Sequence, residues 1–231
     1  MTQPRFCSTL FIFFFPNIKK LGCSISSTSG DLSFALLTHL EALNIDNYMC
    51  NSVTLANPIR FSETLKKLTL KGLCLPWDYM STIQRLPKLE VLKLLDSSFN
   101  GHLWETGDEP FHRLKYLKLE KLNIRFWEAS SINFPRLRKL AVKFYKDLSE
   151  IPLVLGNIST LEHIEIDYSN PCVLNSVNRI QEAQREMGNY DIHVHFAQVD
   201  HACQVFSEGK PVNFTHMYTS QVFFQGDPFF D

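Results

Sequence analysis

One hydrophobic pattern recurs along this chain at nearly constant intervals, and it limits the possible folds more than any other feature. In each copy, apolar residues occupy positions i, i+3, i+6 and i+8, as in Leu86, Leu89, Leu92 and Leu94. Seven copies lie between residues 15 and 166, and Ser62 is the only polar residue among their 28 positions. The third position falls at residues 21, 43, 68, 92, 117, 140 and 164, so the copies follow one another at intervals of 22 to 25 residues.

The end of each copy distinguishes a strand from a helix. Leu92 and Leu94 are two residues apart, which puts them on one face of a β-strand but about 200° apart around an α-helix. A bundle of amphipathic helices, which the spacing of three would allow, is disfavoured for this reason. An L-x-x-L-x-L segment within a repeat of about 20–29 residues is the signature of a leucine-rich repeat. We therefore predict an α/β leucine-rich-repeat solenoid, with a parallel β-sheet on the concave face and irregular or helical segments on the convex side.

The core of such a solenoid is shared between neighbours, because one repeat cannot bury its own apolar residues. We expect the third pattern position of each repeat to lie at the centre of this core. Replacing one of these residues by alanine would cost roughly 2–5 kcal/mol. The core residues that we single out are Leu43, Leu68, Leu92, Leu117, Leu140 and Ile164.

The pattern divides the chain into four parts. Residues 1–14 are unassigned, and residues 15–170 hold about seven repeats. Apolar residues at helical spacing, followed by an alternating segment at 191–196, predict a helix-strand cap over 171–196. Residues 197–231 carry no repeat, and we expect them to be weakly ordered. The asparagine that often closes the repeat is missing, so we also expect loose and non-uniform turns after the strands.

The composition disfavours several classes of function. Lys and Arg number 23 against 24 Asp and Glu, a net charge of -1 that indicates neither nucleic acid nor a membrane surface as the partner. The six cysteines are too dispersed for a zinc site or a disulfide framework, which favours free thiols in a reducing compartment. The apolar run at 10–15 is too short to span a bilayer and lacks a signal-peptide cleavage site, so we expect a cytoplasmic protein.

Catalytic and metal-binding chemistry is weakly represented. No nucleophile, base and acid can be grouped from the sequence, so we expect no enzyme and no cofactor. His193 and His195 share one strand face and could bind a metal, but no third ligand is evident. We therefore predict no metal site and interpret the two histidines as a structural pair.

Several segments of residues 15 to about 196 resemble a known family. These are FPNIKKL at 15–21, LKKLTL at 65–70, LPKLEVLKL at 86–94 and FPRLRKL at 134–140, followed by IPLVLGNI at 151–158 and the helix predicted from 176 to 187. The chain resembles the C-terminal leucine-rich-repeat region of plant nucleotide-binding leucine-rich-repeat disease resistance proteins, in particular the late blight resistance group. The resemblance implies a non-catalytic protein-interaction module that recognises a pathogen effector or holds the nucleotide-binding module inactive.

The chain also departs from that family. It has no G-x-x-x-x-G-K-[ST] phosphate-binding loop, and residues 1–14 are too few to hold the modules that precede the repeats. We therefore expect part of a receptor. Two alternatives stay open: a leucine-rich-repeat adaptor of the F-box kind, and a secreted repeat protein that binds another protein.

The residues that alternate with the inward leucines indicate where a partner would bind. They face the concave side, where the middle repeats are basic and the last one is acidic, with an apolar spot among the lysines. Such a strip suits an acidic protein surface, either the receptor's nucleotide-binding module or an effector. Lysines placed only for solubility are the alternative. The predicted partner-binding residues are Lys67, Lys71, Val91, Lys93, Leu95, Tyr116, Lys118, Lys139 and Lys143.

Overall fold

The structure is a computed structural model of the 231-residue chain. It describes residues 17–25, 32–47, 58–145, 147–167, 171–197, 206–207 and 210–211. The predictions for residues 1–14 and for nearly all of 197–231 concern positions outside these ranges.

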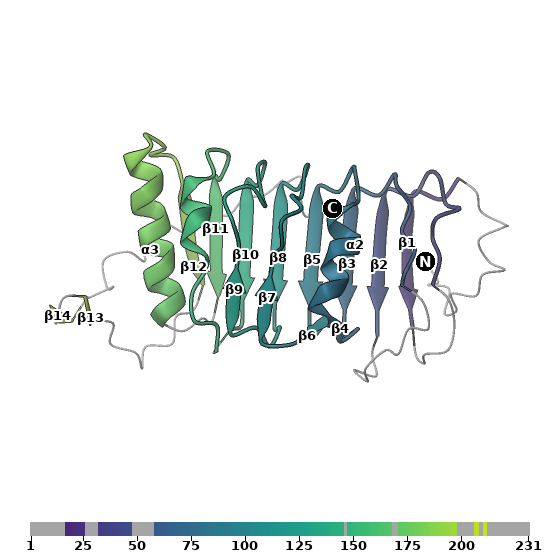
Figure 1. Cartoon of the computed structure of the whole chain (residues 1–231), viewed down its shortest axis with the longest axis horizontal. Helices are drawn as coiled ribbons and strands as arrows, with labels where there is room; N and C mark the ends of the chain where they lie inside the picture. The colour runs from purple at the N-terminus through teal and green to yellow at the C-terminus, as the bar shows by residue number, and fades with distance from the viewer. Residues whose placement is uncertain are drawn as a thin grey trace.

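Eight parallel strands form one sheet in which every strand pairs with the strand of the next repeat (Figure 1). Equivalent residues face each other across the sheet, so that Leu43, Leu68 and Leu92 are register partners. This ladder confirms the predicted leucine-rich-repeat solenoid and its parallel sheet. The strands are β1 (Lys20–Ser24), β2 (Ala42–Asp46), β3 (Lys67–Lys71), β5 (Val91–Leu95), β8 (Tyr116–Glu120), β10 (Lys139–Lys143), β11 (His163–Asp167) and β12 (His193–Ala197).

The core lies between the sheet and the return segments that connect its strands. The second and fourth residues of the strands point into it, whereas the first, third and fifth face away. The six predicted core residues are all buried, with no more than 2% of any side chain exposed. Ser62, the polar exception in the pattern, is also buried and donates a hydrogen bond to the Leu37 carbonyl oxygen at 2.8 Å.

Short elements and stacked aromatic rings build the return segments. The ring centroids of Trp77 and Trp104 lie 5.0 Å apart, and those of Trp104 and Trp127 lie 4.9 Å apart. One ring is thus supplied by each of three successive repeats, and the rings stack along the return segments. The elements are β4 (Leu75–Pro76), η1 (Trp77–Tyr79), α2 (Met80–Gln84), β6 (Phe99–Asn100), β7 (Leu103–Glu105), β9 (Phe126–Glu128) and η2 (Leu153–Asn157).

The turns after the strands are more regular than the sequence predicted. The residue that follows β3, β5, β8 and β10 has a positive φ in each case: 66° at Gly72, 43° at Asp96, 53° at Lys121 and 60° at Phe144. Its N–H donates to a backbone oxygen at the end of the next strand, as from Lys121 to the Lys143 oxygen at 3.1 Å. The prediction of loose, non-uniform turns is therefore wrong here, because backbone hydrogen bonds replace the missing asparagine ladder.

A long helix and a further strand follow the seven predicted repeats. The helix α3 (Pro171–Glu186) packs on η2, and β12 pairs in parallel with β11. The segment interpreted as a cap therefore contributes an eighth strand to the same sheet. Beyond it, β13 (Phe206–Ser207) and β14 (Lys210–Pro211) form a short antiparallel pair.

Candidate interaction surface on the open face of the sheet

The side of the sheet opposite the return segments carries all nine predicted partner-binding residues. We call it the open face; it consists of the first, third and fifth residues of the eight strands, and it is the concave face of the sequence prediction. Register rows run across it, so that Lys67, Val91, Tyr116 and Lys139 are successive neighbours. The structure thus brings lysines from four repeats onto one surface.

The apolar spot among these lysines is largely buried. Val91 and Tyr116 are 3% and 1% exposed, and with Ala141 they form a small cluster separate from the main core. The Lys93 and Lys139 ammonium nitrogens lie 5.7 and 5.4 Å from the centroid of the Tyr116 ring, a geometry that suits cation–π attraction. Val91 and Tyr116 therefore pack beneath the lysines. Of the three apolar residues among the predicted partner-binding residues, these two are buried and Leu95 is half-buried.

Acidic side chains compensate much of the positive charge in the second half of the open face. Lys118 pairs with Glu120 at 2.6 Å, while Lys139 and Lys143 both pair with Glu165, the former at 3.7 Å. At the edge of the face, Lys71 pairs with Asp96 at 3.2 Å. The sequence prediction overlooked these ion pairs, although Glu120 and Glu165 were visible at outward strand positions.

Glu165 shows how tightly this half of the face is organised. Burial raises the pKa of its carboxyl group, but the hydrogen-bonded Lys143 ammonium, Lys139 and His195 lower it by more. The net pKa therefore lies below the usual range, and the carboxylate stays charged between the two lysines. The Glu165 carboxylate thus holds Lys139 and Lys143 in ion pairs and reduces the positive charge that they present to a partner.

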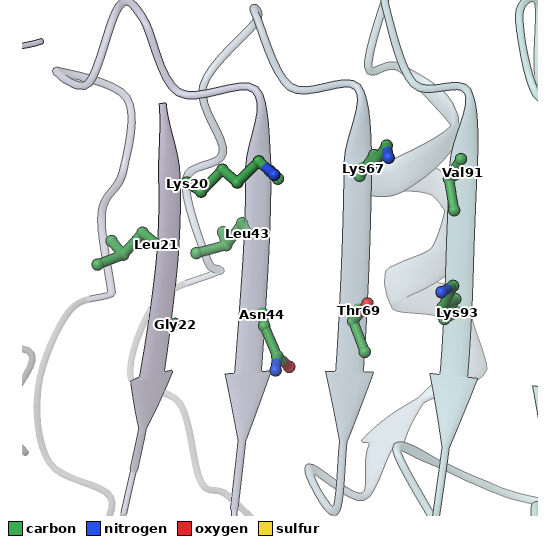
Figure 2. A pocket seen from close by; sticks show the side chains of 10 residues that line it. Lys20, Leu21, Gly22, Leu43, Asn44, Lys67, Thr69, Val91 and Lys93 are labelled. Atoms are coloured by element: carbon green, nitrogen blue, oxygen red, sulfur yellow. The ribbon is translucent and has the colours of Figure 1, made fainter. Parts of the chain in front are cut away.

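The first half of the open face is hollowed instead of filled. A hollow of about 320 Å³ lies over β1, β2, β3 and β5, as Figure 2 shows. Small side chains occupy three successive positions of one register row: Gly22, Asn44 and Thr69. Three lysines line the hollow around these small residues. Lys20 and Lys67 belong to the register row formed by the first residues of the strands, and Lys93 is the next member of the row of Gly22, Asn44 and Thr69. The sequence prediction missed the hollow, which the small outward residues could have indicated. It also did not include Lys20 among the partner-binding residues.

The other candidate chemistry is limited. The rings of His163 and His193 stack at 5.3 Å between centroids, but the described residues contain no group of three or more His, Cys, Asp or Glu able to hold a metal. The described cysteines, Cys23, Cys74 and Cys172, form no disulfide. Within the same part of the chain, no helix is long and apolar enough to cross a bilayer.

The repeating strand, the shared core and the open sheet face define a leucine-rich-repeat protein. No family model matches the chain. Over 174 residues, or 74% of its length, it is 34% identical to the late blight resistance protein homolog R1B-13 of Solanum demissum and 35% identical to R1B-12. It is 31% identical over 176 residues to the homolog R1B-23 of the same plant. The resemblance to the late blight resistance group is therefore confirmed.

The matching segment is a small part of these relatives. It covers 15% of R1B-13, 13% of R1B-12 and 14% of R1B-23. The likeness thus concerns the repeat region, and the activity and partners of the whole relatives are not transferred with it.

Proposed function

We propose that this chain is a non-catalytic protein-interaction module of a plant immune receptor, whose open face binds an acidic surface of a protein partner. The partner is either the nucleotide-binding module of a receptor or a pathogen effector. The relatives named for late blight resistance support the immune role. The same proposal puts the protein in the cytoplasm, in keeping with described cysteines that form no disulfide.

The lysines gathered over four neighbouring strands carry the proposal of an acidic partner. Lys93 and Lys118 are register partners at the centre of this group of lysines, and both are partly exposed. Positive charges of this kind steer association and select the partner more than they add affinity. The acids among them reduce the net charge without removing it, because Glu165 alone faces both Lys139 and Lys143.

Reversing the central charges tests this proposal. The double variant Lys93→Glu/Lys118→Glu should bind the nucleotide-binding module of a receptor, or an effector, about ten-fold more weakly at low salt, chiefly through slower association. The difference should shrink at moderate salt, because ions screen exposed charges. Surface plasmon resonance at both salt concentrations measures these rates.

The matched control reverses two charges away from the open face. Lys88→Glu/Arg136→Glu changes the net charge equally, and both residues are exposed in the turns before β5 and β10. This control should bind like the wild type, and circular dichroism should show both variants folded. Unchanged affinity of the Lys93/Lys118 variant at both salt concentrations would contradict the proposal.

A further inference from the structure

The hollow over β1, β2, β3 and β5 arises from a run of small side chains across the sheet. Gly22, Asn44 and Thr69 are consecutive register partners, and Lys93 ends the row. At Gly22 a Cβ atom would meet nothing within 4 Å, so this end of the floor is open. Tyr116 and Ala141 fill the corresponding surface farther along the sheet. The first half of the open face can therefore receive a ligand below the level of its lysines.

The charges around the hollow have one sign. Lys20, Lys67 and Lys93 belong to its lining, and none of the described residues that line it is acidic. Asp46 occupies the next outward position beyond Asn44, at the end of β2, and does not belong to the lining. Farther along the face, Glu120 and Glu165 already pair with lysines. Anionic groups of a ligand are thus best accommodated in the hollow.

The register sets the spacing of the ligand's charges. Lys20 and Lys67 lie in one row on either side of Ala42, which puts their strands about 10 Å apart at the usual strand separation. Three residues of polypeptide in the extended polyproline II conformation rise about 9 Å and bring side chains i and i+3 to the same side, whereas in a β-strand they would face opposite sides. The size of the hollow is at the lower end of the roughly 300–1,000 Å³ found for ligand pockets, enough for a short segment.

We propose that this hollow binds an extended acidic segment of a protein partner, with carboxylates about three residues apart that contact Lys20 and Lys67. The inference rests on the proposed function, because it names the part of the open face and the partner chemistry involved. It differs in placing the contact over the hollow of β1, β2, β3 and β5 instead of over the whole open face.

A peptide probe tests this inference with the full chain. The probe is a fluorescein-labelled Gly-Ser peptide with glutamate at every third position, and its control carries glutamine there. Fluorescence anisotropy at low salt should show binding of the glutamate peptide and at least about ten-fold weaker binding of the glutamine peptide. Equal binding of both peptides, or no binding of the glutamate peptide, would overturn the inference.

Two variants separate shape from charge. Gly22→Leu fills the hollow without changing any charge, and the open space around Gly22 makes it compatible with the fold. It should weaken binding of the glutamate peptide about ten-fold, whereas Ser131→Leu, in an exposed turn between β9 and β10, should not. Lys20→Glu/Lys67→Glu should abolish binding, and Lys88→Glu/Arg136→Glu should leave it intact.

The outcomes also separate this inference from the proposed function. If the peptide ignores Gly22→Leu while the partner protein is lost in Lys93→Glu/Lys118→Glu, the hollow is not the site and the function stands. If the peptide results hold but the partner protein ignores the Lys93/Lys118 variant, the hollow binds an acidic segment without needing Lys93, and the proposed binding of the partner through the central lysines is wrong.

Discussion

At the scale of single residues, the same residue type has opposite roles at different places in the repeat. Gly72 follows β3 with a φ of 66°, and a Cβ atom there would overlap the Asn47 carbonyl oxygen. Gly22 lies within β1 in open space, and its value is the room that it leaves on the open face. One glycine is therefore required by the backbone, and the other is available for function.

The two glycines should respond differently to alanine. Gly72→Ala should lower the free energy of unfolding by at least about 2 kcal/mol, because it adds both left-handed strain and a clash. Gly22→Ala should leave stability unchanged or slightly raised, since alanine restricts the unfolded chain. Urea unfolding followed by circular dichroism measures both. Equal stability of the two variants would contradict this account of the turn.

At the scale of elements, buried amide side chains attach the return segments to their neighbours. Gln184 of α3 is fully buried, and its Nε2 donates to the Gly156 oxygen at 2.7 Å and to the Ile158 oxygen at 2.9 Å. Gln84 at the end of α2 donates in the same way to the Thr106 and Glu109 oxygens of the next repeat. The helices thus supply hydrogen-bond donors to carbonyl groups of the irregular segments.

Removing one such amide should be costly. Gln184→Leu keeps the approximate volume but leaves the buried Gly156 oxygen without this donor, at a cost of about 1–3 kcal/mol, while the Ile158 oxygen keeps the Leu161 N–H at 3.1 Å. Glu182→Leu, on a more exposed position of the same helix, should change the unfolding free energy by less than about 0.5 kcal/mol. Thermal and urea unfolding check both values, and a Gln184→Leu variant as stable as the control would show that water replaces the amide.

The ion pairs between β10 and β11 predict a dependence on pH. Because the pKa of Glu165 is lowered in the folded protein, its contribution to stability is complete above its unfolded pKa of about 4.3 and is lost as the pH falls through the folded pKa. Lys143→Met should raise the Glu165 pKa and should destabilise the protein at about pH 6 more than at about pH 3.

An NMR titration of the Glu165 carboxyl group measures the shift directly. Lys121→Met is the matched control, because Lys121 pairs with Asp96 at the edge of the face and lies away from Glu165. The control should leave the Glu165 titration unchanged. A Glu165 pKa that is the same in Lys143→Met and in the wild type would show that Lys143 does not hold this carboxylate.

At the scale of the whole molecule, the fold is a stack in which each repeat contacts mainly its neighbours. Each inner strand of the large sheet pairs with the strands of the repeats before and after it, and no strand pairs across the stack within the described residues. Stability in such a fold is close to a sum over repeats and their interfaces. Damage near one end should therefore stay local.

Hydrogen exchange can test this locality. Leu43→Ala should speed amide exchange in β1 and β2 while leaving β10 and β11 protected, because the lost packing affects only the end of the stack. Leu117→Ala, in the middle, should destabilise the stack by roughly 2–5 kcal/mol and raise exchange on both sides of β8. Uniform acceleration in both variants would show that the solenoid unfolds as one unit.

The periodic sequence determined the strands, their register and the core. Hydrophobic residues at i+6 and i+8 can share a face only in a strand, and the constant interval places equivalent strands side by side. The strand over 191–196 was predicted, but its place in the same sheet was not. Val194 follows Ile164 by 30 residues, a longer interval than the 22 to 25 of the other repeats, because α3 takes the place of a short return segment.

Only the tertiary structure decided which open-face residues are accessible and which of their charges are compensated by ion pairs. Alternation along one strand says which face a residue is on, but exposure depends on its neighbours from adjacent strands. Tyr116 is buried because Val91 and Ala141 flank it and two lysines lie over its ring. Lys139 and Lys143 are paired because the next repeat places Glu165 beside them. Cross-strand packing, which no single repeat encodes, therefore leaves the hollow beside Gly22 as the open part of the surface.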